Sequence, residues 1–171
     1  KAKDLESFVA VQTDDECNSA FLMLKFKKNK KKYHLEIGFD GKKEKAPFKN
    51  LLETPRMSLM FSPNGKIAFA QIDGKKIGDY DFLQSYITYN KNKYDFKNTN
   101  VCALSVAGDG EGIRVQGEIH LPKEISSGKY TFDFFKTSFS DAIFVRTTVQ
   151  YPYTAETTSI STENSALGRY S

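Results

Sequence analysis

Residues 58–72 read SLMFSPNGKIAFAQI, two runs rich in apolar residues that flank the tetrapeptide Ser62-Pro63-Asn64-Gly65. Proline presets φ for a turn, and Asn-Gly tolerates the positive φ that tight hairpin turns need. The segment therefore predicts a β-hairpin, with one strand before the turn and one after it.

The same kind of signal recurs along the chain. In residues 33–39, apolar side chains alternate with His34 and Glu36, which is typical of a half-buried strand. The lysine-rich turn before this run predicts a hairpin with residues 21–26. Further strands are predicted over 7–12, 79–89, 94–96, 101–107, 113–121, 130–136 and 142–151.

Two connections need separate mention. Residues 108–112 hold three glycines, which permit a bulged or wide turn between the strands predicted over 101–107 and 113–121. Residues 47–55 are bounded by prolines and leave room for at most one helical turn.

The pattern predicts an all-β fold, an antiparallel β-sandwich that is jelly-roll-like or a larger two-sheet arrangement, with a closed β-barrel as the alternative. The domain is expected over residues 1–153. Residues 154–171 are rich in Thr, Ser, Glu and Asn, so they are expected to form a polar tail or a linker to a further domain.

Composition narrows the classes of function. The chain has 171 residues, a mean hydropathy of -0.51 and no apolar run near the ~20 residues that a membrane span requires. A net charge of +4 is low for a nucleic-acid-binding domain, so no nucleic-acid partner is expected. The lysines clustered over 25–32 are interpreted as protection of an edge strand. Tryptophan is absent, which counts against a typical sugar-stacking surface.

Catalytic and cofactor motifs are also missing. The chain has no GxSxG, HExxH or Walker A sequence, so no catalytic residue, cofactor or metal is expected. Cys17 and Cys102 allow one disulfide, or two buried thiols.

The strongest candidate for a binding surface comes from strand alternation. Polar side chains alternate with Val115 and Ile119 in one strand and with Val145 and Val149 in another. If both strands belong to one sheet, their polar rows form a surface suited to hydroxyl-rich or anionic ligands. The predicted binding residues are Arg114, Gln116, Glu118, His120, Arg146 and Gln150.

The leading hypothesis is a non-catalytic binding or accessory module of an exported, possibly multidomain protein. It is expected to be secreted or at the cell surface, and to bind a carbohydrate or a cell-surface protein. One alternative is a β-barrel that encloses a small apolar ligand. The other is a glycan-active enzyme with two catalytic carboxylates drawn from Asp109, Glu111, Glu118 and Asp133.

Overall fold

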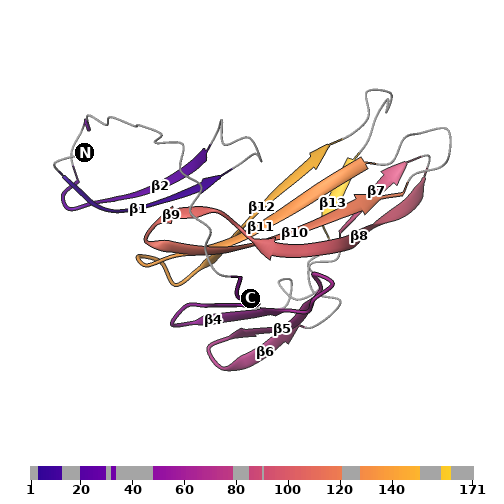
Figure 1. The fold of residues 1–171 in the computed structure, drawn as a ribbon, viewed down its shortest axis with the longest axis horizontal. Coiled ribbons are helices and arrows are strands. Elements are labelled where there is room, and N and C mark those ends of the chain that lie inside the picture. The colour runs from indigo at the N-terminus through magenta and orange to yellow at the C-terminus, as the bar shows by residue number, and fades with distance from the viewer. Residues whose placement is uncertain are drawn as a thin grey trace.

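The computed structural model describes residues 4–12, 20–29, 32–33, 48–78, 85–89, 91–120, 128–150 and 159–162. Within these ranges the chain forms thirteen β-strands and no helix, and the strands make three antiparallel sheets (Figure 1). The predicted all-β sandwich is confirmed, and the described sheets stay open instead of closing into a barrel. No described segment is a helix long and apolar enough to cross a bilayer.

The three sheets differ in size. The three-stranded sheet has the order β2-β1-β9, with β1 Leu5–Gln12, β2 Ala20–Phe26 and β9 Val106–Gly108. The four-stranded sheet runs β3-β4-β5-β6, with β3 Leu51–Glu53, β4 Met57–Phe61, β5 Ile67–Ile72 and β6 Lys75–Gly78. The six-stranded sheet runs β12-β11-β10-β8-β7-β13, with β7 Ser85–Tyr89, β8 Asn92–Ala103, β10 Gly110–Ile119, β11 Gly128–Thr137, β12 Ile143–Gln150 and β13 Ser159–Thr162.

The main core lies between the six-stranded and four-stranded sheets. The face of the six-stranded sheet that packs on the four-stranded sheet is called the inner face here. Phe134 on this face meets Phe61 of β4 with ring centroids 4.8 Å apart. The buried residues of this core are Leu52, Leu59, Phe61, Ile67, Ala70, Ile113, Val115 and Phe134. Because side chains alternate along β10 and β11, the residues between these core positions project to the opposite, outer face.

The predicted hairpin over 58–72 is confirmed as β4 and β5. The N–H of Gly65 donates to the carbonyl of Ser62 at 2.9 Å, and Gly65 has a φ of 78°. The carbonyl of Gly65 in turn accepts from Asn98 Nδ2 of β8 at 2.9 Å. The turn is therefore fixed to the six-stranded sheet as well as to its own strands.

The three-stranded sheet covers one end of the outer face. Val9 and Val11 of β1 pack with Leu104, Val106 and Phe135 in a second core. β9 and β10 follow each other with only Asp109 between them, yet β9 pairs with β1 and β10 pairs with β8 and β11. One stretch of chain therefore belongs to two sheets, as the left side of Figure 1 shows.

Some local predictions differ from the structure. The predicted antiparallel pair on either side of residues 108–112 is present as β8 and β10, but the glycine loop is wrong, because 106–108 form β9 and 110–112 begin β10. Residues 51–53 form β3 and no helical turn. Within residues 154–171, predicted as a polar tail or linker, residues 159–162 pair with β7 as β13, and the domain boundary stays a prediction.

The predicted partner of residues 21–26 falls mostly outside the described residues. Residues 34–39, which include His34 and Glu36, are not described, and neither is Cys17. In the described part of the chain, β2 pairs with β1.

Candidate functional site

The polar residues predicted on two strands do lie on one face of one sheet. β11 lies between β10 and β12, and the registers align Arg114 with Asp133 and Arg146, Gln116 with Thr131 and Thr148, and Glu118 with Lys129 and Gln150. Residues directly opposite each other in a sheet project to the same side. These three cross-strand rows form the part of the outer face that we call the polar face.

The first row is an ion-pair row and is largely internal. Arg114 Nε and one terminal nitrogen donate to the two carboxylate oxygens of Asp133 at 2.6 and 3.1 Å, and Arg146 donates to the same carboxylate. Asp133 is fully buried and Arg114 is only 8% exposed. Arg114 also donates to the backbone carbonyl of Gln12 at 3.1 Å, which ties the end of β1 to the sheet. Arg114 therefore stabilises the fold through buried hydrogen bonds, and little of its side chain is exposed to a ligand in solvent.

The next two rows are more accessible. Gln116 and Thr131 are half-buried, while Lys129 and Gln150 are exposed. Asn100 of β8 extends the Gln116 row, and its amide donates to Gln116 Oε1 at 3.4 Å. Lys97 of β8 extends the Glu118 row in the same way. The accessible part of the polar face consists of Lys97, Asn100, Gln116, Glu118, Lys129, Thr131, Thr148 and Gln150.

His120 lies one residue beyond β10, at the end of this surface. Its Nε2 is 3.6 Å from a carboxylate oxygen of Glu118, and both side chains are about half exposed to solvent. The contact can steady the imidazole without withdrawing it from solvent.

Sequence reasoning missed the contribution of β11. Lys129, Thr131 and Asp133 alternate with Tyr130, Phe132 and Phe134, so the period-2 pattern was available in the sequence. What was not available was the position of β11 between β10 and β12, which makes its polar residues the middle of the surface.

The polar face presents donors and acceptors in a regular array. Neighbouring strands lie about 4.8 Å apart, so amide, hydroxyl and charged groups repeat at that interval across the sheet. Amides and hydroxyls both donate and accept hydrogen bonds, which suits ligands rich in hydroxyl groups. Among its accessible residues the array contains two lysines, Lys97 and Lys129, and one glutamate, so the surface has a small positive charge.

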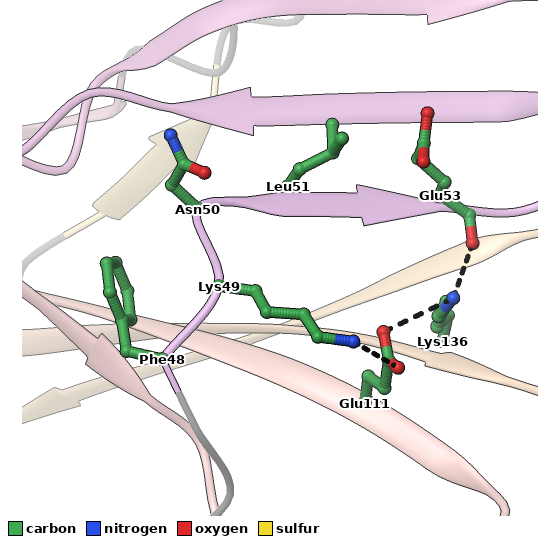
Figure 2. A pocket seen from close by; sticks show the side chains of 7 residues that line it. All are labelled: Phe48, Lys49, Asn50, Leu51, Glu53, Glu111 and Lys136. Atoms are coloured by element: carbon green, nitrogen blue, oxygen red, sulfur yellow. Dashed lines mark hydrogen bonds and ion pairs between the residues drawn. The ribbon is translucent and has the colours of Figure 1, made fainter.

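A second site lies between β3 and the ends of β10 and β11, where residues 48–51 cross the sheet (Figure 2). This cleft has a volume of about 500 Å³ and is lined by Phe48, Lys49, Asn50, Leu51, Glu53, Glu111 and Lys136. Glu111 lies between two ammonium groups, with Lys49 Nζ 3.0 Å from one carboxylate oxygen and Lys136 Nζ 3.3 Å from the other. The hydrogen bond from Lys49 holds the pKa of Glu111 below its ordinary value, and the nearby charge of Lys136 acts in the same direction.

The four acids considered for paired-carboxylate chemistry already have partners. Asp109 accepts from the hydroxyl of Ser7 at 2.6 Å, Glu118 contacts His120, and the ion pairs of Glu111 and Asp133 are given above. Asp133 and Glu111 belong to different faces of the sheet, because they occupy positions of opposite parity in the β10–β11 register. The described residues contain no group of three or more histidine, cysteine, aspartate or glutamate side chains that could hold a metal ion.

Comparisons with protein-family models, with curated proteins and with solved structures find nothing that matches this chain.

Proposed function

We propose that this domain is a non-catalytic binding module of an exported protein and that it binds a glycan through the accessible part of the polar face. The observation that supports this proposal is the alignment of amide and hydroxyl side chains across β8, β10, β11 and β12. A flat array of paired donors and acceptors can satisfy the repeated hydroxyl groups of an extended saccharide chain. The ion-pair row beside it links β10, β11 and β12, the strands on which most of the array is built.

The array favours a glycan over an apolar ligand. Its accessible residues carry no large apolar side chain, so it offers little hydrophobic surface to bury. The backbone that carries these side chains is already held by the β-ladders, so binding does not have to order a loop, which helps a shallow surface to bind.

The proposal is tested with a panel of neutral and acidic oligosaccharides on an array, followed by titration calorimetry with the best binder. The test variant is Gln116→Ala with Glu118→Ala and Gln150→Ala, which spares the buried ion-pair row. We expect at least a tenfold loss of affinity, since three polar contacts are removed together.

The matched control is Gln71→Ala with Lys75→Ala on the four-stranded sheet, whose affinity should equal that of the native protein. Equal affinity in the test variant and the control, or the absence of any binder in the panel, would overturn the proposal.

A further inference from the structure

The cleft between β3 and the ends of β10 and β11 lies on the inner face, away from the polar face. Glu111 and Lys136 are directly opposite each other in the β10–β11 register, and Lys49 reaches them from the segment before β3. Lys136 also donates to the backbone carbonyl of Glu53 at 2.7 Å. In Figure 2 both ammonium groups meet at the carboxylate of Glu111, while the side chain of Glu53 points away from them.

The ammonium groups retain capacity for another acceptor. Each lysine has three N–H donors. In the described part of the chain, Lys49 has Glu111 as its partner, and Lys136 has Glu111 and the carbonyl of Glu53. At least one donor on each lysine is therefore available to a ligand in the cleft.

The charge of this cluster favours an anion with a single charge. Two ammonium groups face the carboxylate of Glu111, so the cluster formed by Lys49, Glu111 and Lys136 has a net charge of +1. Glu53 also lines the cleft, but its carboxylate points away from this cluster (Figure 2). Glu111 spans the two lysines with its two oxygens, which shows that their spacing suits a carboxylate. The pKa of Glu111 is lowered chiefly by its hydrogen bond with Lys49, so its carboxylate stays ionised near neutral pH.

An apolar wall completes the cleft. Phe48 is 51% exposed although it is a large aromatic residue, and it lines the same cleft as the two lysines. Leu51 adds a half-buried aliphatic side chain. An exposed ring beside a charged cluster can cover the flat or apolar part of a ligand whose charged end is held elsewhere.

We propose that this cleft binds a small monocarboxylate, with its carboxylate held by Lys49 and Lys136 and its ring lying against Phe48. Two kinds of molecule have this chemistry, an acidic sugar and an aromatic acid. The proposal does not depend on glycan binding at the polar face, because no residue is shared between the two sites.

Binding is measured by titration calorimetry at low salt with D-glucuronate and with phenylacetate. Glucose and 2-phenylethanol serve as the uncharged counterparts. We expect one or both acids to bind in the millimolar range and the uncharged counterparts to bind at least tenfold more weakly. The acid that binds tighter identifies the source, and the absence of binding by both acids would overturn the proposal.

Substitutions in the cleft should change the affinity for the acid in opposite directions. Lys49→Gln and Lys136→Gln should each weaken binding about tenfold, and Phe48→Ala should weaken it severalfold. Glu111→Gln should tighten binding, because it removes the carboxylate that competes with the ligand and raises the charge of the cleft.

Lys75→Gln, at an exposed position of β6, is the charge-matched control and should bind as the native protein does. Weaker binding by Glu111→Gln, in a variant whose thermal unfolding shows that it is folded, would contradict the assignment. Equal losses in Lys136→Gln and Lys75→Gln would also contradict it. The polar-face variant should keep native affinity for the acid, so failure of one proposal is distinguishable from failure of the other.

Discussion

Replacement of Asp133 by asparagine should strongly destabilise the domain. Asp133 is fully buried and accepts hydrogen bonds from both Arg114 and Arg146. Asparagine has nearly the same size as aspartate, but it has no negative charge. Its NH₂ group cannot accept the hydrogen bonds that the guanidinium groups of Arg114 and Arg146 donate. Removing one partner from a buried ion pair costs about 3–5 kcal/mol, because the other charge is left without compensation.

The effect is measured by urea and thermal unfolding. For a domain of this length each kcal/mol shifts the melting temperature by roughly 2–4 °C, so we expect a decrease of about 10 °C. The control is Asp73→Asn, which breaks a two-pronged pair with Arg56 at 2.7 and 2.9 Å. Both of those side chains are more than half exposed, so this variant should unfold close to the native protein.

A triple variant separates charge from packing. Arg114→Met, Asp133→Leu and Arg146→Met remove all three charges together, and most of the lost stability should return because no buried charge is left unpaired. Two results would refute the claim that Asp133 compensates two buried charges. One is a loss of unfolding free energy in Asp133→Asn no larger than in Asp73→Asn, and the other is a triple variant as unstable as Asp133→Asn.

Three further predictions concern other parts of the structure. Gly117→Ala should prevent normal packing, because its Cβ would overlap the ring of Tyr130 and the carbonyl oxygen of Lys97; circular dichroism and melting temperature should both change far more than for Ala107→Gly. Burial raises the pKa of the Tyr130 hydroxyl, because the folded protein favours its neutral form. The stability that comes from this preference is fully present below pH 10 and is lost as pH rises above it, so the urea midpoint of the native protein should fall in alkali. Tyr130→Phe should reduce that fall, and an unchanged fall would contradict this explanation. The pKa of Glu111 is lowered from 4.5, so the stability that its ionised carboxylate adds is present above pH 4.5 and is lost as pH falls through the pKa of the folded state. The urea midpoints of Glu111→Gln and the native protein should therefore converge in acid, and a difference that stays constant with pH would contradict this prediction.

The elements that could be predicted are those whose signal is local. The β4–β5 hairpin follows from Pro63, Asn64 and Gly65, and β11 and β12 follow from their period-2 alternation. These signals depend only on residues that are adjacent in the sequence, so they can be recognised without knowing how the rest of the chain folds.

The elements that were missed depend on distant partners. β9 has three residues and forms by pairing with β1, and β13 is made of small polar residues with Ile160 alone apolar. Backbone hydrogen bonds hold such strands, and backbone groups leave no pattern in the side chains. The sequence predicts Gly110 and Gly112 as turn residues, but a Cβ at Gly112 would press on Leu104, so close packing is the reason for glycine there.

The residues of the candidate sites also differ in whether a local sequence pattern reveals them. The residues of β10 and β12 could be named, because each strand alternates cleanly, whereas the burial of Arg114 could not be foreseen without Asp133 beside it. The cleft could not be predicted, because Lys49, Glu111 and Lys136 come from three separate segments and meet only in the folded chain.

The pairing of β1 with β9 sets an order of assembly during synthesis. Val9 pairs with Gly108, so β1 leaves the ribosome about a hundred residues before its partner strand β9. At roughly 5–20 residues per second this delay lasts on the order of 5 to 20 seconds. During that interval the edge of β1 that later receives β9 can pair with other nascent chains, which is the hazard that chaperones limit. A slower-translating host would prolong this exposure, and the soluble yield of the protein should then depend on translation speed.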